Sequence, residues 1–185
     1  MKYQILLDEV RQNFASVVWT HKIQEKQADL YEWQYKCVMT INIVLASITS
    51  AGILTVIFND GFALRLFSAL VSLGSLGTTA VLGSFDLKAM SERNKNTANR
   101  LVILRNQLIH VIEKLHGEGD IEEINQEYEN IMSEVHRVYA DAPSTTSKAE
   151  RKASKALKDN NEYTYTQEEI DRFLPPSLRG EIHNV

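Results

Sequence analysis

Hydrophobic and polar positions divide the chain into an apolar middle and polar flanks with helical patterning. No charged side chain occurs from Cys37 to Asn59 or from Leu66 to Phe85. Since about 20 helical residues cross the hydrocarbon layer of a bilayer, each run is long enough to span a membrane. The turn between them covers only residues 60–65, which makes the two helices antiparallel neighbours. We therefore predict a transmembrane hairpin, with one span over 37–59 and the other over 66–85.

The alternative to a membrane hairpin is a pair of helices buried inside a soluble core. The rest of the chain has little other apolar material with which to wrap two uncharged runs, so the pattern favours the bilayer. Both runs also contain several Ser, Thr and Gly residues. Small and hydroxyl side chains are typical of membrane helices that pack against partners, so we expect contacts between helices.

The N-terminal flank, residues 1–36, has the pattern of an amphipathic stem helix. Its apolar and aromatic positions alternate between spacings of three and four, which is typical of a coiled-coil seam. The stripe, in which His21 and Gln24 are polar exceptions, consists of Tyr3, Leu7, Val10, Phe14, Val17, His21, Gln24, Ala28, Tyr31 and Tyr35. No helix-breaking residue precedes Cys37, so we expect the stem to continue into the first span.

A helical hairpin is predicted over residues 86–141, after the second span. Its two apolar stripes can face each other as an antiparallel pair, with the stem as a third partner. Glycine favours helix ends, so Gly117 and Gly119 divide the two helices. The stripes are Leu101, Leu104, Leu108, Val111 and Leu115, then Ile121, Ile124, Tyr128, Ile131, Val135 and Val138. The predicted fold is therefore an all-α membrane protein with a stem, a hairpin and a cytosolic helical bundle.

The C-terminal part of the chain reads as a linker over 142–165 and a short helix with a tail over 166–185. The linker is rich in Ser, Thr, Lys and Ala and has room for a short basic helix, and contact of its lysines with anionic lipid is the alternative to a solvated linker. Thr166 and Glu169 have the spacing of a capping box. Pro175 and Pro176 then end the short helix.

Charges next to the spans predict the orientation of the hairpin. Lys and Arg favour the cytoplasmic side of a membrane. They are concentrated on the side of the termini, whereas the turn has Arg65 beside Asp60. We therefore expect a multi-pass protein with both termini in the cytoplasm. The cations on the terminal side are Lys26, Lys36, Lys88, Arg93 and Lys95.

Composition and motifs argue against an enzyme. The formal charge of -4 lacks the basic signature of a nucleic-acid-binding protein, and a lone cysteine excludes a disulfide framework. We find no phosphate loop, nucleophile elbow or metal signature, and we expect no catalytic residue, metal or cofactor. His21, Glu25 and Asp29 share one helical face through their spacing of four. A surface ion network with neighbouring lysines explains this spacing better than a cation site does.

Polar residues within the spans are the most informative candidates for a functional site. Ser68, Ser72, Ser75 and Thr79 form one stripe of hydroxyl groups, and the first span adds Asn42 and Thr49. One interpretation is a helix–helix interface and the other is a pore lining. Two helices cannot enclose a lumen, so a pore requires a homo-oligomer. The glycines that permit close packing are Gly52, Gly74, Gly77 and Gly83.

The order of these elements, together with several short stretches, resembles the SLATT family of two-transmembrane effectors. The similar stretches are FASVVWTHKIQEKQAD (Phe14–Asp29), GSFDLK (Gly83–Lys88), APSTTSKA (Ala142–Ala149) and EEIDRFLP (Glu168–Pro175). They resemble the fifth subgroup most. The resemblance implies an effector of bacterial antiphage defence that oligomerises in the inner membrane and forms a pore. A non-conducting scaffold that anchors a cytosolic defence complex is the alternative.

The resemblance also implies an upstream sensor protein or a nucleotide signal. The chain has no recognisable sensor domain, so a partner is expected to carry any such signal. His21 and Gln24 occupy stripe positions where apolar residues would stabilise a plain stem more. We therefore expect the contact in this part of the stem, at Trp19, His21, Gln24, Glu25 and Asp29.

Overall fold

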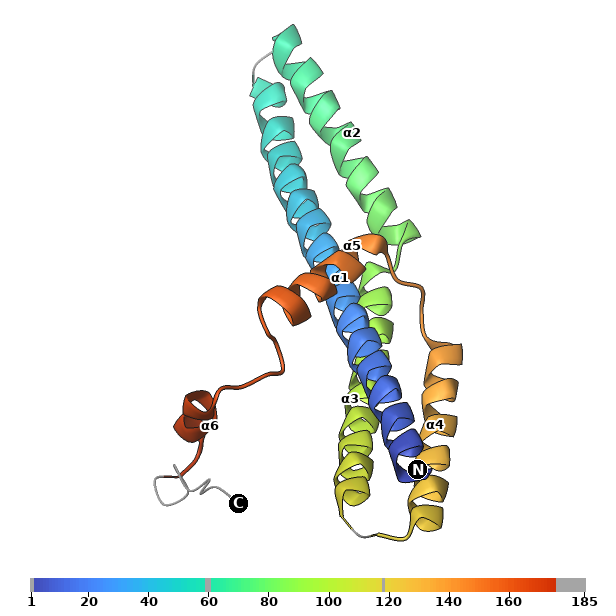
Figure 1. The fold of residues 1–185 in the computed structure, drawn as a ribbon. Coiled ribbons are helices and arrows are strands. Elements are labelled where there is room, and N and C mark those ends of the chain that lie inside the picture. The colour runs from blue at the N-terminus through green and yellow to red at the C-terminus, as the bar shows by residue number, and fades with distance from the viewer. Residues whose placement is uncertain (1, 59–60, 118, 176–185) are drawn as a thin grey trace.

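The computed structural model describes residues 2–58, 61–117 and 119–175, which form an elongated stack of a hairpin upon a helical bundle (Figure 1). Every regular element of the described chain is a helix, as predicted. In chain order these are α1 (Lys2–Phe58), α2 (Phe62–Ser84), α3 (Leu87–His116), α4 (Ile121–Asp141), α5 (Ser147–Ser154), the π-helical turn η1 (Lys155–Asp159) and α6 (Gln167–Phe173).

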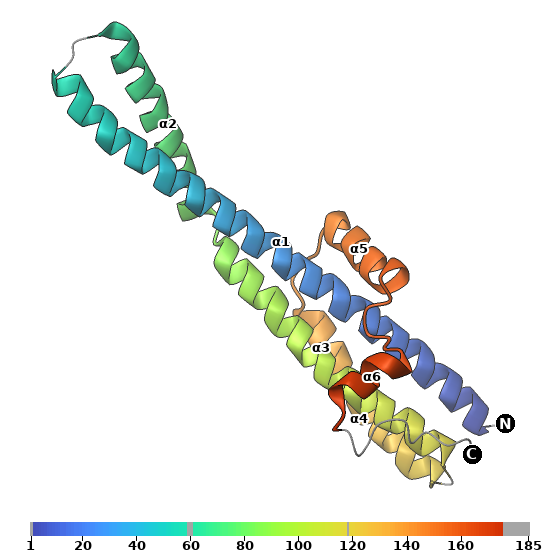
Figure 2. The ribbon, with the colours of Figure 1, turned by 90° about the vertical axis from the view of Figure 1, so that its left-hand side faces the viewer.

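The longest element, α1, joins the two halves of the molecule. It has 57 residues and runs without interruption from the bundle into the hairpin (Figure 2). At 1.5 Å per residue, its length is about 85 Å. The continuity of stem and first span follows from the lack of proline throughout α1 and of glycine before Gly52.

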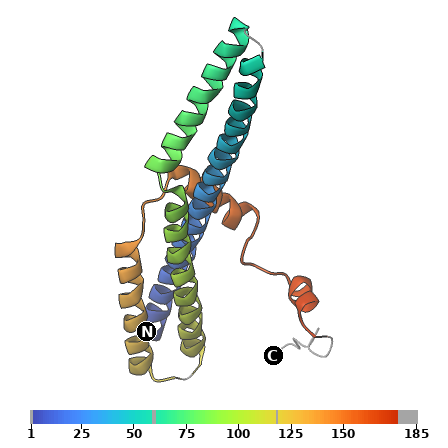
Figure 3. The ribbon, with the colours of Figure 1, turned by 180° about the vertical axis from the view of Figure 1, so that it is seen from behind.

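The hydrophobic core lies in the bundle, between the N-terminal half of α1, α3 and α4 (Figure 3). The stripes predicted on these helices supply it, because burying one apolar face of each helix removes that surface from water. Ile121 is only partly buried, and Leu6 and Met132 join the core in addition. The central residues are Val10, Val17, Leu101, Leu108, Val111, Val135 and Val138.

The helix ends in the bundle are capped by nearby side chains. Asp86 begins α3 by accepting a hydrogen bond from the Ala89 amide at 2.9 Å. Asp120 accepts one from the Glu122 amide at 2.9 Å and begins α4. These caps satisfy amides that have no partner within the helix. The break between α2 and α3 is therefore only Phe85 and Asp86.

The hairpin consists of the second half of α1 and of α2. Helix α2 begins at Phe62, four residues before the predicted start, since a helix can include Arg65 in its first turn. The Arg65 amide already donates to the Gly61 carbonyl at 3.2 Å. Residues 59 and 60, where the predicted turn begins, lie outside the described residues.

The prediction of a solvated linker over 142–165 requires a correction. The segment contains α5, which packs on α1. Ala149, Ala153 and Ala156 are buried there, because their spacing of four and three puts all three methyl groups on one face. Helix α6 has the predicted capping box between Thr166 and Glu169. It stands away from the bundle and buries none of its residues (Figure 1).

Candidate functional site

The amide of Asn42 is paired inside the hairpin. Its Oδ1 lies 2.7 Å from Thr78 Oγ1 and 3.1 Å from Thr79 Oγ1. Each threonine hydroxyl also lies within 3.0 Å of the Ser75 carbonyl, so its single proton can serve either acceptor. A buried amide without a partner is costly, and these contacts remove that cost. Sequence reasoning missed Thr78, although it continues the spacing from Ser68 and Ser75.

The predicted hydroxyl stripe divides between two environments. Half-buried positions on α2 recur at spacings of three and four and include Ser68 and Ser75. Ser72 and Thr79 are exposed beside them. On the first span, Thr49 is half-buried, and its hydroxyl donates to the Leu45 carbonyl at 2.8 Å. The structure therefore separates an inner pair, Ser68 and Ser75, from an exposed pair, Ser72 and Thr79, of which Thr79 still reaches Asn42.

Two of the four glycines permit close contact between α1 and α2. A Cβ atom at Gly52 would lie 3.0 Å from Ser68 Oγ, and one at Gly74 would lie 3.4 Å from Leu45 Cδ1. At Gly77 and Gly83 a Cβ atom would meet nothing within 4 Å. These two glycines are therefore not needed for packing within the chain and leave a smooth outer surface on α2.

The outer surface of the hairpin is apolar and is not covered by the chain. The structure has two helices long and apolar enough to cross a membrane, and no residue of their apolar windows is buried. The helices of a soluble core would be covered. Apolar surface of this extent marks a contact with lipid or with other proteins. It includes Ile41, Ile43, Val44, Leu66, Phe67, Leu70, Leu73 and Leu76.

A second polar region lies where residues 143–165, here called the strap, cross the stem. Gln24 Nε2 donates to the Pro143 carbonyl at 3.1 Å. Gln27 Oε1 accepts from both the amide and the hydroxyl of Thr146, each at 2.8 Å. Both glutamines are buried. The polar residues on the stem therefore bind the chain's own C-terminal part.

Lys22 is the buried cation of this region, with 2% of its surface exposed. Its Nζ lies 3.0 Å from Glu25 Oε2 and 3.1 Å from the Tyr163 hydroxyl, and it also pairs with Glu162. Burial alone would lower the pKa of Lys22, but the hydrogen bonds with Glu162, Glu25 and Tyr163 raise it above its usual value. The strap thus supplies two of the three partners that keep this ammonium group charged.

Tyr163 of the strap fits between two cations of the bundle. Its ring centroid is 4.5 Å from Lys22 Nζ and 5.0 Å from Arg105 Cζ. Its hydroxyl donates to Glu25 Oε2 at 2.6 Å and lies 3.4 Å from His21 Nδ1. The backbone φ of Tyr163 is 75°, a value that is uncommon for a bulky residue. The two cations at its ring and the hydrogen bonds of its hydroxyl hold it in this conformation.

Burial sets the protonation state of His21. Desolvation lowers the pKa of His21 to about 4, against the opposing attraction of Glu25. Arg105 and Lys22 repel the protonated ring and lower the pKa further. The imidazole is therefore neutral at physiological pH.

The five predicted contact residues lie along the strap but differ in access. His21, Gln24 and Glu25 contact the strap. Trp19 is half-buried with Lys158 Nζ 5.4 Å from its ring, and Asp29 is exposed, 3.9 Å from Lys26 Nζ. Within the described ranges no group of three His, Cys, Asp or Glu residues is placed to hold a metal.

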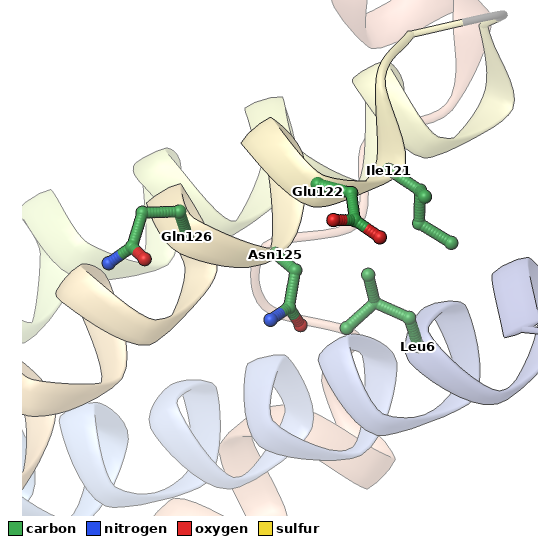
Figure 4. Close-up of a pocket in the computed structure, with 5 residues that line it drawn as sticks. All are labelled: Leu6, Ile121, Glu122, Asn125 and Gln126. Carbon is green, nitrogen blue, oxygen red and sulfur yellow. The ribbon is translucent and has the colours of Figure 1, made fainter.

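The clefts of the bundle offer polar contacts. One of about 480 Å3 lies between the beginnings of α1 and α4. Figure 4 shows Leu6 of α1 directed toward Ile121 and Glu122 of α4, with Asn125 and Gln126 further along that helix. A single carboxylate and two amides can donate and accept hydrogen bonds, but they do not form a nucleophile–base pair.

One family model matches the chain. It is described as SMODS and SLOG-associating 2TM effector domain family 4, and the match covers residues 6–169. These residues include the hairpin, the bundle core and the whole strap. Neither a curated protein nor a solved structure matches the chain.

Proposed function

The chain belongs to family 4 of the SMODS and SLOG-associating 2TM effector domains, and we propose that it is a membrane effector of a bacterial antiphage defence system. The family is the SLATT family that the sequence resembles, and its number is four rather than five. The proposed action is permeabilisation of the inner membrane by an oligomer. The two apolar helices support a membrane protein, and the positive charges beside the spans support cytoplasmic termini.

The observation that carries the proposal is the exposed hydroxyl edge on the outer side of α2. Ser72 and Thr79 are exposed and lie seven residues apart, so they share one face of α2. The Thr79 hydroxyl is already engaged by Asn42 and the Ser75 carbonyl, so Ser72 is the main hydroxyl of this edge. Polar groups that face lipid are unfavourable, so this edge belongs toward water or other subunits. Several hairpins with this edge turned inward would surround a hydroxyl-lined path, while Ser68 and Ser75 stay between α1 and α2.

A leucine substitution at Ser72 tests the pore. In liposomes that contain the activated oligomer, Ser72→Leu should abolish dye leakage while the oligomer keeps its size, because the path loses its hydroxyl lining. Ser50→Leu is the matched control, since the Ser50 hydroxyl is bonded to the Ala46 carbonyl of its own helix at 2.9 Å. Equal leakage from Ser72→Leu and the unaltered protein would contradict a lumen at this edge.

A scaffold is the second candidate function, and α6 is the observation that favours it. Phe173 is 81% exposed and Ile170 is 39% exposed on this capped helix outside the bundle. Such a helix could attach a cytosolic protein to a membrane anchor. If assembled protein leaves liposomes sealed, and removal of α6 releases a cytosolic complex from membranes, the scaffold replaces the pore.

The proposed signal acts on the stem beneath the strap. His21 and Gln24 are buried and contact the strap, so a sensor protein or a nucleotide could reach these two residues only after the strap has moved, whereas Glu25 is already about one-third exposed. Trp19 and Asp29 would then border the newly opened surface. We propose release of the strap as the step that connects the signal with the hairpin.

A further inference from the structure

A basic pocket lies at the junction between the bundle and the hairpin, where α3 begins beside the middle of α1 (Figure 2). Its volume is about 300 Å3. Side chains from both helices line it. They include Glu32, Tyr35 and Lys36 of α1 and Lys88, Glu92 and Lys95 of α3.

The position of the pocket along the helices places it at the membrane surface. Lys36 directly precedes the uncharged run that begins at Cys37, and Lys88 follows the end of the second run by three residues. The pocket therefore opens at the depth where the spans leave the hydrocarbon layer. Phospholipid headgroups occupy that depth, and tyrosines such as Tyr35 are enriched there.

The charges of the pocket are only partly neutralised. Lys36 Nζ pairs with Glu32 Oε1 at 2.5 Å. Lys88 and Lys95 are exposed, and no ion pair or hydrogen bond in the described structure engages either ammonium group. They lie seven residues apart on α3 and therefore on one face. Three lysines against two glutamates leave the pocket with a net positive charge.

We propose that this pocket binds the phosphate group of an anionic phospholipid, with Lys88 and Lys95 as its ligands. A phosphate group would supply the anionic partner that neither ammonium group has in the described structure. A cytoplasmic basic pocket at a helix junction is a known type of headgroup site. The Ser91 hydroxyl in the pocket is not available, because it already donates to the Ala28 carbonyl at 2.9 Å. The proposal rests on the membrane placement of the hairpin and not on permeabilisation.

Native mass spectrometry of the full chain in detergent, titrated with phosphatidylglycerol or neutral phosphatidylcholine, tests the site. We expect phosphatidylglycerol to bind more tightly than phosphatidylcholine. Lys88→Gln with Lys95→Gln should weaken phosphatidylglycerol binding roughly thirtyfold, because two cations beside the phosphate are lost. Lys88→Arg with Lys95→Arg should retain it.

Lys152→Gln with Lys155→Gln is the matched control, since both lysines are exposed on or next to α5 and the same charge is removed outside the pocket. Equal weakening by this pair would mean attraction by net charge alone and would overturn the proposal. No preference for phosphatidylglycerol would overturn it as well. Binding of inorganic phosphate in place of the lipid would assign the pocket to a free anion and reject the lipid. Leakage is not measured, so failure here leaves the pore proposal unaffected.

Discussion

Lys22 binds the strap through an ammonium group whose burial adds little net stability to the bundle. Taking an ammonium group out of water is unfavourable, and its pairing with two carboxylates offsets that penalty. The two carboxylates are about one-third exposed, so each remains hydrated when the lysine is absent. Substitution of the lysine and substitution of its two carboxylate partners should therefore change the free energy of unfolding by different amounts.

Unequal effects on stability are expected when the cation and when its two carboxylate partners are removed. Lys22→Met keeps the apolar stem of the side chain and should change the free energy of unfolding by less than about 1 kcal/mol. Glu25→Gln with Glu162→Gln leaves the buried cation unpaired and should destabilise the bundle by about 3 kcal/mol. Chemical denaturation in detergent measures both values. Equal destabilisation by the two variants would show that Lys22 is not effectively buried.

His21 should make the bundle less stable in acid. Its pKa is about 4 in the folded state against 6.5 in the unfolded chain, so the unfolded chain binds more protons between these values. Stability is thus complete above pH 6.5 and decreases as the pH falls toward 4, by about 2 kcal/mol at pH 5. The lowered pKa values of Glu25 and Glu162 add a loss in the same direction below pH 4.5.

The variant His21→Gln should flatten this dependence between pH 7.5 and pH 5 in thermal unfolding followed by circular dichroism. His110→Gln serves as the control, because the His110 side chain is 69% exposed. If the thermal stability of His21→Gln still falls between pH 7.5 and pH 5 as in the unaltered protein, other groups cause the acid sensitivity.

At the scale of elements, the stripes on α1, α3 and α4 could be predicted because burial of apolar positions at helical spacing is a local property of the sequence. Leu101 to Leu115 and Ile124 to Val138 follow that rule. The strap could not be predicted in the same way. Its helix buries only alanines within a Ser- and Lys-rich segment, so the overall polarity indicated a solvated linker.

The candidate sites show the same division. The polar residues at stripe positions, His21 and Gln24, were noticed in the sequence, but their partners lie 119 or more residues away. Pairing over such distances depends on the tertiary fold and leaves no periodic signal. In the hairpin, the sequence indicated that the side-chain amide of Asn42 needs a hydrogen-bond partner. That the partner is Thr78 depends on the register between α1 and α2, which the sequence does not reveal.

Covalent attachment of the strap should prevent activation. Gln27→Cys with Thr146→Cys, in a Cys37→Ser background, replaces two side chains that are 2.8 Å apart and can be bridged by a short bis-maleimide. If strap release precedes permeabilisation, the bridged protein should cause no dye leakage from liposomes under activating conditions. The unbridged double variant is the control. Full leakage from the bridged protein would show that activation does not require release of the strap.

At the scale of the whole molecule, α1 alone among the described helices belongs to both the bundle and the hairpin. The polar contacts of the strap and those of Asn42 lie on this one helix, although different partners form them. A Gly-Gly-Ser insertion after Tyr35 should leave both halves folded but eliminate depolarisation during phage challenge, because it interrupts the helix between them. The same insertion between Phe85 and Asp86, where the chain is already not helical, is the control. Depolarisation that persists after the first insertion would rule out transmission along α1.

An uninterrupted helix transmits torque as well as force. Each residue turns the helix by about 100°, so a slip of the stem by one residue against α3 would rotate the first span by the same angle. Such a rotation would carry Asn42 away from Thr78 and bring a different edge of the hairpin toward its neighbours. The 57 residues of α1 would thus convert a small change of register in the bundle into a large change of orientation in the hairpin.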